Sequence, residues 1–322
     1  MNILVLAPLQ EENFKKIEQS FPEDHFIFTS NKKVTQQMID ECDIIVGNPS
    51  FRFDFNRENI KAILLNSAGS DAYVKEGLLH PNTKLANASG TYGKAIAEHT
   101  IGMMLALNKN LKTYIHHMDE NLWKSVSTGK ELYQSTVVII GLGDLGYELA
   151  KRLKAFDCHI IGVKRSLSLK PEHIDELYTT SQLDMVLPLA DFVILALPQT
   201  PETIHLMNKE KMLLMKKDAI LVNIGRGSAI VTEDLIDVLS LGHFYGVALD
   251  VVEEEPLSSL SPLWHFDNVL ITPHASGGYA WQSARDYYTE LVIRNIHHLK
   301  NNEDLENEVD FQTGYRKHIN YK

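Results

Sequence analysis

From residue 135 onwards, short apolar runs alternate with connections that are long enough to form a helix. No other feature of the sequence restricts the possible folds as much. Near-continuous apolar strands joined by helices are typical of a parallel sheet covered on both faces. The pattern predicts a doubly wound α/β domain with strands at Val137–Ile140, Ile160–Val163, Phe192–Leu197, Ile220–Asn223, Val247–Val251 and Val269–Thr272.

The first part of the chain shows a shorter version of the same alternation. A length of 322 residues agrees with two domains of typical size, about 100–200 residues each. We therefore expect a second α/β domain, with buried strands at Ile3–Ala7, Asp43–Val46, Ala62–Leu65 and Leu85–Ala86.

Two long helical patterns connect these regions. Lys94–Met118 predicts a helix that crosses between the domains, and its buried apolar face includes Ile96, Thr100, Met103, Met104 and Leu107. Tyr279–Lys300 predicts a C-terminal helix, followed by a polar tail, 301–322, that is expected to fold back on the surface. Because that helix can return the chain to its first domain, we expect residues 1–98 and 285–322 to form one domain around an inserted domain, 99–284.

Composition narrows the range of partners and compartments. A net charge of −11 argues against a general nucleic-acid or anionic-membrane partner, since both call for a basic face. Two cysteines, Cys42 and Cys158, are expected to be buried free thiols in a reducing compartment. The N-terminal apolar run stops at Pro8 and predicts a first strand rather than a signal peptide, so a soluble, cytoplasmic protein is expected.

A glycine-rich loop follows the first strand of the second domain, with the sequence Gly141-Leu142-Gly143-Asp144-Leu145-Gly146. In a βαβ unit the first glycine of G-x-G-x-x-G allows a tight turn, the second lets the backbone approach a pyrophosphate, and the third permits close helix packing. The alternative is a structural glycine turn. The unit that ends at Val163 is the context the motif needs, and it predicts a dinucleotide site.

The end of the next strand carries Lys164, Arg165 and Ser166 where an NAD site has a ribose-binding carboxylate. Two cations and a hydroxyl suit a 2′-phosphate instead. The alternative is a solvated basic turn. We predict that NADP(H) is preferred over NAD(H).

Three later strands end in residues capable of chemistry: Asn223-Ile224-Gly225-Arg226-Gly227, the run from Asp250 to Pro256, and Thr272-Pro273-His274-Ala275-Ser276-Gly277. Ligands of open parallel sheets bind at the carboxyl ends of strands. Taken singly, each segment has a plainer explanation. Arg226 could form a surface ion pair, the acidic run before Pro256 could be a solvated face, and His274 is one of fourteen histidines in the chain.

Together these segments resemble the D-isomer-specific 2-hydroxyacid dehydrogenases, whose signatures are N-x-x-R-G, D-V-x-x-x-E-P-L and T-P-H. The resemblance spans nearly the whole chain. It includes a substrate loop, Asn66–Asp71, the Ala97-Glu98-His99 helix start and the strand end Leu197-Pro198. The chain departs from the family at Lys164–Ser166, and at Val252, where phenylalanine is usual.

The resemblance implies a discontinuous substrate domain, an inserted dinucleotide-binding domain, a homodimer and no metal. Arg226 would hold the substrate, His274 would be the acid/base paired with Glu255, and Asp250 would bind the nicotinamide carboxamide. Substrate contacts are implied for Ser67, Ala68, Gly69 and Ser70. Further cofactor contacts are implied for Asp144, Leu145, Leu197, Pro198, Thr203, Asn223, Ile224, Gly225, Ser276 and Gly277.

The chemistry agrees with these implied roles. Reduction of a 2-keto acid adds hydride to C2 while a proton reaches the oxygen. A histidine beside a carboxylate can deliver that proton, and arginine recognises a carboxylate bidentately. Glyoxylate, hydroxypyruvate and larger keto acids are all candidate substrates. A phosphoglycerate dehydrogenase remains a rival, although Gly47–Phe51 lacks a basic cluster and only Arg52 lies beside it. A non-catalytic dinucleotide-sensing binding protein is the alternative from another class.

Overall fold

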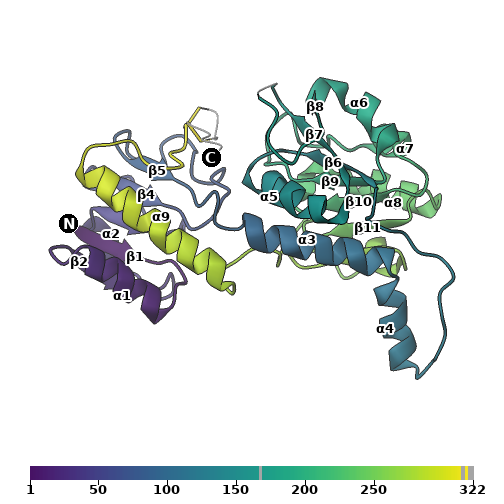
Figure 1. Cartoon of the computed structure of the whole chain (residues 1–322). Coiled ribbons are helices and arrows are strands. Elements are labelled where there is room, and N and C mark those ends of the chain that lie inside the picture. The colour runs from purple at the N-terminus through teal and green to yellow at the C-terminus, as the bar shows by residue number, and fades with distance from the viewer. Residues whose placement is uncertain (167–168, 313–315, 318–322) are drawn as a thin grey trace. The chain divides into compact units, whose positions relative to one another are not determined.

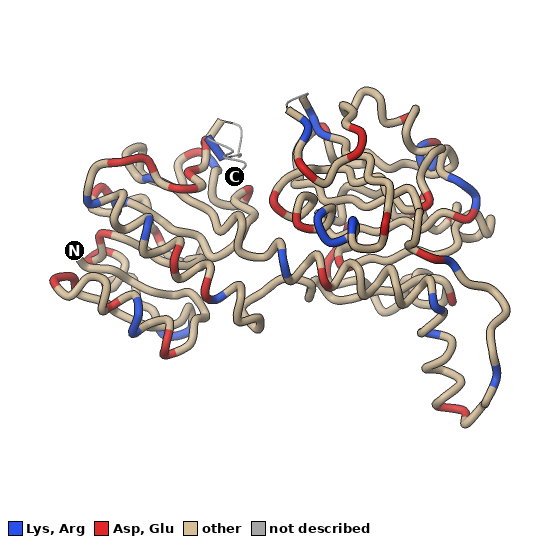
Figure 2. The backbone as a smooth tube through the Cα atoms, in the orientation of Figure 1, with Lys and Arg blue, Asp and Glu red and all other residues tan. Residues whose placement is uncertain are grey.

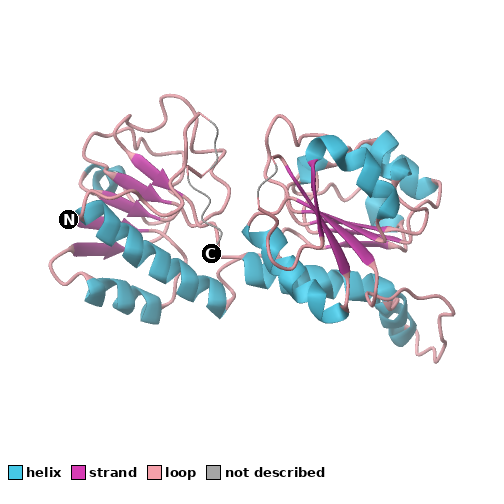
Figure 3. Cartoon of the chain, turned by 45° about the horizontal axis from the view of Figure 1, so that its top comes forward, coloured by secondary structure: helices cyan, strands magenta, loops and turns pink. Residues whose placement is uncertain are grey.

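The computed structural model describes residues 1–166, 169–312 and 316–317. The chain forms two compact units, Met1–Tyr92 with Gly278–Lys322, and Gly93–Gly277 (Figure 1). The boundaries expected after residues 98 and 284 fall earlier, because helix α3 lies entirely in the second unit and helix α9 in the first. In Figure 3 the strands of each unit form one layer with helices beside it, as expected for two Rossmann-like α/β domains.

The first unit is built on a five-stranded parallel sheet in the order β2-β1-β3-β4-β5. Its strands are β1 (Asn2–Val5), β2 (His25–Phe28), β3 (Ile44–Val46), β4 (Ala62–Leu64) and β5 (Lys84–Ala86), and its helices are α1 (Glu11–Ser20), α2 (Gln36–Asp40) and α9 (Gln282–Lys300). The edge strand β2 was not predicted, because none of its residues is fully buried.

Helix α9 and the tail complete the first unit. The buried Tyr288 of α9 donates its hydroxyl to the carbonyl of Leu64, 2.7 Å away. The tail does more than cover the surface, because the amide of Val309 donates to the carbonyl of Leu85 and Glu308 bridges to Ala86. Residues 313–315 and 318–322 of the predicted tail lie outside the described residues.

The second unit contains a seven-stranded parallel sheet in the order β12-β11-β10-β9-β6-β7-β8. The strands are β6 (Thr136–Ile140), β7 (His159–Lys164), β8 (Glu176–Thr179), β9 (Phe192–Leu195), β10 (Ile220–Asn223), β11 (Gly246–Leu249) and β12 (Val269–Ile271). The edge strand β8 was not predicted, since all its residues are half-buried. Chain order reverses between the neighbours β6 and β9, the place where open α/β sheets bind ligands.

The helices of this unit are α3 (Gly93–Asn108), α4 (Leu111–Asp119), α5 (Asp144–Leu153), α6 (Leu183–Val186), α7 (Lys209–Leu214) and α8 (Thr232–Ser240), with 3₁₀ turns at Lys154–Phe156, Thr180–Gln182, Leu187–Leu189, Gly227–Ala229 and Pro262–His265. The single helix predicted over Lys94–Met118 is two helices, because Asn110 takes a left-handed conformation with φ 55°. Helix α3 does not cross between units. It buries Thr100, Met103 and Met104 within the second, as its apolar face predicts.

Cys42 and Cys158 are free and buried, as predicted, and burial raises the pKa of the Cys42 thiol to about 12. The reducing, cytoplasmic compartment inferred from them stays a prediction. Acidic and basic residues are interspersed over both units (Figure 2). Among the described residues, no helix is both long and apolar enough to span a membrane.

Candidate active site

The glycine loop opens a space at the N-terminus of α5. Gly141 has a φ of 105°, and a Cβ there would lie 2.5 Å from the carbonyl oxygen of Ala196. A Cβ at Gly146 would lie 2.1 Å from the carbonyl oxygen of Gly141, so the helix passes directly against the loop. A Cβ at Gly143 would meet nothing within 4 Å, and no side chain caps the helix there. This arrangement of open backbone and helix N-terminus fits a dinucleotide pyrophosphate.

The ends of β9 and β10 lie beside this loop. A Cβ at Gly225 would be 2.5 Å from the carbonyl oxygen of Leu197, so these two strand ends are in contact. Thr203 turns the following segment back, since its hydroxyl donates to the carbonyl of Pro198 at 2.7 Å. The structure thus brings the predicted residues of both strand ends to the switch point of the sheet.

The predicted 2′-phosphate residues follow β7, the neighbour of β6. Lys164 is the last residue of the strand and is half-buried, whereas Arg165 and Ser166 are exposed. The register pairs Ile140 with Val163, so Lys164 follows directly beside the start of the glycine loop. Their contact with a cofactor stays a prediction.

Arg226 occupies a turn that is fixed by the buried Asn223. The side-chain amide of Asn223 donates to the carbonyl of Arg226 at 3.0 Å, and its oxygen accepts the amide of Gly225 at 3.2 Å. Gly227 packs so tightly that a Cβ would lie 1.8 Å from the carbonyl oxygen of Val252. The Arg226 turn therefore lies directly against the segment that leads to Glu255.

Asp250 is the buried anchor of the loop that carries His274. Its carboxylate accepts the hydroxyls of Thr272 and Ser276 and the amides of Ala275 and Ser276. Burial raises its pKa, but these hydrogen bonds outweigh burial and hold the pKa below its usual value. Because both oxygens already accept protein donors, the role the structure gives Asp250 is to hold this loop. Its contact with a carboxamide stays a prediction.

His274 and Glu255 are brought into contact as predicted. The Nδ1 atom of His274 lies 2.9 Å from Oε2 of Glu255, and the other carboxylate oxygen accepts the amide of Val252 at 3.2 Å. His274 has a φ of 52°, and its amide donates to the carbonyls of Asp250 and Thr272. Both side chains are partly exposed, so a proton on the imidazole can reach a bound molecule.

The predicted substrate loop belongs to the first unit, where it follows β4. Ser67 donates its hydroxyl to the carbonyl of Gly69 at 2.7 Å and accepts the side-chain amide of Asn48 at 3.0 Å. Ala68 is held by Asn87, whose amide donates to its carbonyl at 2.9 Å. The exchange of hydrogen bonds between Asn48 and Asn66, which fixes the start of this loop, was not foreseen. The sequence feature that could have indicated this pair is an asparagine shortly after each of the neighbouring strands β3 and β4.

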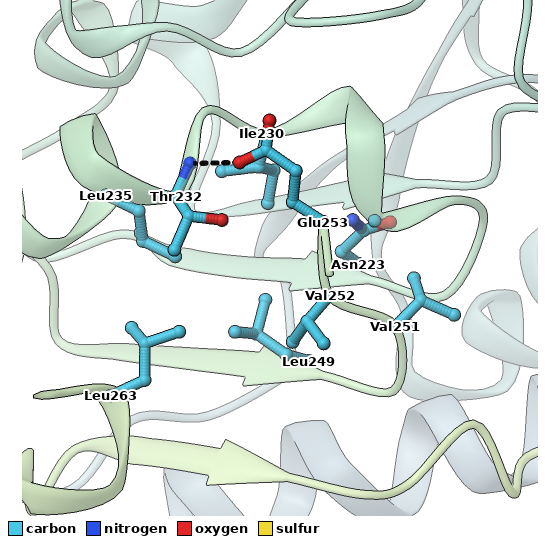
Figure 4. Close-up of a pocket in the computed structure, with 10 residues that line it drawn as sticks. Asn223, Ile230, Thr232, Leu235, Leu249, Val251, Val252, Glu253 and Leu263 are labelled. Carbon is cyan, nitrogen blue, oxygen red and sulfur yellow. Dashed lines mark hydrogen bonds between the residues drawn. The ribbon is translucent and has the colours of Figure 1, made fainter. Parts of the chain in front are cut away.

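A hollow lies between residues that follow β10 and residues that follow β11 (Figure 4). Its lining is Asn223, Gly227, Ile230, Thr232, Leu235, Leu249, Val251, Val252, Glu253 and Leu263. Glu253 accepts the amide of Thr232 at 3.0 Å and pairs with His205 at 2.6 Å. Burial raises the pKa of Glu253, and its hydrogen bonds with Thr232 and His205 outweigh this and lower it. The lining is mostly apolar and omits Arg226, Glu255 and His274, so this hollow is not the reactive site.

Comparison with known proteins agrees with this geometry. Residues 101–276 match the family model described as D-isomer specific 2-hydroxyacid dehydrogenase, NAD binding domain. A glyoxylate reductase from Thermofilum pendens is 34% identical over 243 residues, covering 74% of this chain and 71% of that protein. A D-3-phosphoglycerate dehydrogenase from Methanocaldococcus jannaschii is 32% identical over 318 residues, covering 96% of this chain but 59% of that protein.

A solved structure shows the same likeness in three dimensions. It is an NADPH-dependent glyoxylate/hydroxypyruvate reductase from Sinorhizobium meliloti, in complex with NADP and sulfate. It superposes with a TM-score of 0.82 at 26% identity, covering 98% of this chain and 99% of that one.

Proposed function

The chain belongs to the D-isomer-specific 2-hydroxyacid dehydrogenase family, and we propose that it reduces a small 2-keto acid, of the size of glyoxylate or hydroxypyruvate, with NADPH as its preferred cofactor. It is an oxidoreductase that acts on CH–OH donors with a nicotinamide dinucleotide. The observation that carries the proposal is the Glu255–His274 pair on the segments beside the Arg226 turn.

A dinucleotide held at the glycine loop would supply the hydride, and the chain supplies the proton and the substrate contacts. His274 holds a proton next to Glu255, whose carboxylate contacts Nδ1 and orients the ring, and gives that proton to the C2 oxygen as charge grows there. Arg226 binds the substrate carboxylate with its planar guanidinium and stabilises the developing alkoxide. We assign further carboxylate binding to backbone amides near Ser67, Ala68, Gly69 and Ser70.

The preference for NADPH rests on Lys164, Arg165 and Ser166. A carboxylate at position 164 would accept the ribose hydroxyls of NADH and repel a 2′-phosphate, and the chain has a lysine there. Hydrogen bonds to charged groups contribute about 1.5–3 kcal/mol, and surface charges lose part of this to screening. The Sinorhizobium meliloti reductase, which is NADPH-dependent, supports this preference by likeness.

The test is reduction of a panel of 2-keto acids, including 3-phosphohydroxypyruvate, with NADPH and with NADH. We expect NADPH to exceed NADH by at least about tenfold in kcat/KM, equivalent to about 1.4 kcal/mol. Lys164→Asp should shift the enzyme towards NADH. Lys217→Asp is the control and should not, because Lys217 is exposed and precedes the start of β10, at the end of the sheet away from the glycine loop. Equal or better use of NADH by the wild type rejects the cofactor assignment. If the enzyme prefers 3-phosphohydroxypyruvate, the proposed substrate is wrong and a phosphoglycerate dehydrogenase takes its place. If no keto acid is turned over, the proposed reductase activity is rejected.

We also propose a homodimer that covers helix α4. No residue of α4 is buried, although Leu111, Ile115 and Met118 share one helical face, and Leu122 and Trp123, which follow the helix, are exposed as well. Exposed apolar stripes of this kind mark protein interfaces, and soluble oligomers most often pair identical patches about a two-fold axis.

A further inference from the structure

His99 contacts the loop that holds the reactive histidine. It lies in the first turns of α3, which packs against the sheet of the second unit (Figure 1). Its Nε2 atom is 3.1 Å from the hydroxyl of Thr272, at the end of β12, and 3.8 Å from Oδ1 of Asp250, at the end of β11. Three elements that are distant in sequence therefore meet at one polar cluster.

The direction of these hydrogen bonds is fixed by donor counting. Thr272 has one hydroxyl hydrogen and donates it to Oδ1 of Asp250 at 2.6 Å. Its oxygen must then accept from His99, so the Nε2 atom of His99 carries a hydrogen. Asp250 accepts throughout, because its carboxylate also takes the amides of Ala275 and Ser276.

The cluster ends on the backbone around His274. The amide of His274 donates to the carbonyl of Asp250 at 2.8 Å, and the next two amides donate to the Asp250 carboxylate. A Thr272 hydroxyl with no donor from His99 is free to rotate away from Asp250, which would remove one of the bonds that orient this loop.

We propose that His99 is a positioning residue for proton transfer: it fixes the Thr272 hydroxyl on Asp250, and Asp250 holds the His274 loop in place. This proposal rests on the proposed reduction of a 2-keto acid. It assigns His99 no contact with substrate or cofactor, and it predicts that the Nε2 hydrogen, rather than the bulk or charge of the ring, is what the enzyme needs.

Turnover of two variants tests this. His99→Leu should lower kcat by about tenfold, the value of about one hydrogen bond, with the KM for the keto acid within about twofold. His99→Gln, which places an amide hydrogen close to the position of Nε2, should keep kcat within about twofold of wild type. His159→Leu, a partly exposed histidine paired with Glu176 at the opposite end of the sheet, is the matched control and should leave kcat unchanged.

A double-mutant cycle tests the route. In a Thr272→Val background, His99→Leu should cost nothing further, because the atom through which it acts is gone. Additive losses overturn the proposal, as do equal losses for His99→Leu and His99→Gln.

Hydrogen exchange separates this proposal from the proposed function, since it needs no substrate. The Ala275 and Ser276 amides should exchange faster in His99→Leu and Thr272→Val than in wild type and His99→Gln. Wild-type protein that reduces no keto acid rejects the function alone, and unchanged exchange rejects the positioning role alone. If His99→Leu does not fold, the tautomer of His99 in the wild-type protein can be measured from the nitrogen NMR spectrum of its imidazole. A His99 that carries its hydrogen only on Nδ1 overturns the proposal.

Discussion

At Gly143 an added methyl group would touch no atom of the protein, yet it would enter the space in front of the α5 N-terminus. Gly143→Ala should therefore leave the melting temperature unchanged and weaken NADPH binding by at least about tenfold, or about 1.4 kcal/mol. Gly146→Ala is the control for a clash within the fold, because its Cβ would lie 2.1 Å from a carbonyl oxygen. That variant should lose stability as well. Tight cofactor binding by Gly143→Ala, measured calorimetrically, would place the pyrophosphate elsewhere.

His274 is the proton donor of the proposed reaction, so its removal should affect kcat rather than cofactor affinity. His274→Ala should lower kcat by about 10²–10⁴-fold, the usual value of general acid catalysis, while the Kd for NADPH stays within about twofold. Glu255→Gln keeps the shape of the pair but removes the carboxylate that contacts Nδ1 of His274, and it should give a smaller loss. A kcat for His274→Ala within a few-fold of wild type would remove this residue from the mechanism.

The Arg226 turn depends on close contact between two loops. A Cβ at Gly227 would lie 1.8 Å from the backbone oxygen of Val252, so Gly227→Ala must push the Arg226 turn away from the segment that leads to Glu255. We expect a loss of about 1–3 kcal/mol in the free energy of unfolding and a rise in the KM for the keto acid. Gly102→Ala is the matched control, since its Cβ would meet nothing within 4 Å and it lies inside α3. It should be neutral or stabilising by up to about 1 kcal/mol. A Gly227→Ala enzyme with wild-type KM would show that the contact does not position Arg226.

The loop from Thr272 to Ser276 should be sensitive to acid through Asp250. The pKa of Asp250 is lowered in the folded chain, so its contribution to stability is present above the unfolded value of about 3.9 and is lost as pH falls through the folded value. Asp250→Asn lacks this titration. The difference in melting temperature between wild type and Asp250→Asn should therefore shrink as pH is lowered below about 4. A difference that stays constant there would contradict the assignment of an ionised, hydrogen-bonded carboxylate.

At the scale of the whole molecule, the exposed face of α4 predicts self-association. Met118→Glu with Trp123→Ser should convert a homodimer to a monomer in light scattering after size exclusion, because both side chains are exposed in the single chain. Leu260→Glu, an equally exposed residue of the same unit outside α4, is the control and should leave the mass unchanged. A wild-type protein that is monomeric at micromolar concentration, or a dimer that survives the double variant, rejects the α4 interface.

Features that reside in consecutive residues could be predicted before the structure was known. Apolar runs at regular intervals specified two parallel sheets, since a strand covered on both faces has no polar position. The glycine loop was predictable because each glycine answers a local steric demand at Gly141, Gly143 and Gly146. The edge strands β2 and β8 were not predicted, because their residues are only partly buried and form no continuous apolar run. The break at Asn110 escaped as well, since the apolar pattern continues on both sides of it.

The contacts that hold the site in place became visible in the folded chain. The contact between Glu255 and His274 was inferred by resemblance, but the reason for it lies in Asp250, a carboxylate that collects donors from a loop more than twenty residues away. His99 reaches Thr272 across 173 residues, a separation over which no local spacing carries information. Sequence patterns report burial and backbone demands, which are local. The direction of a buried hydrogen bond depends on which donors and acceptors the fold brings to within about 3 Å of each other. In this site, those partners meet only when the strand ends and α3 pack together.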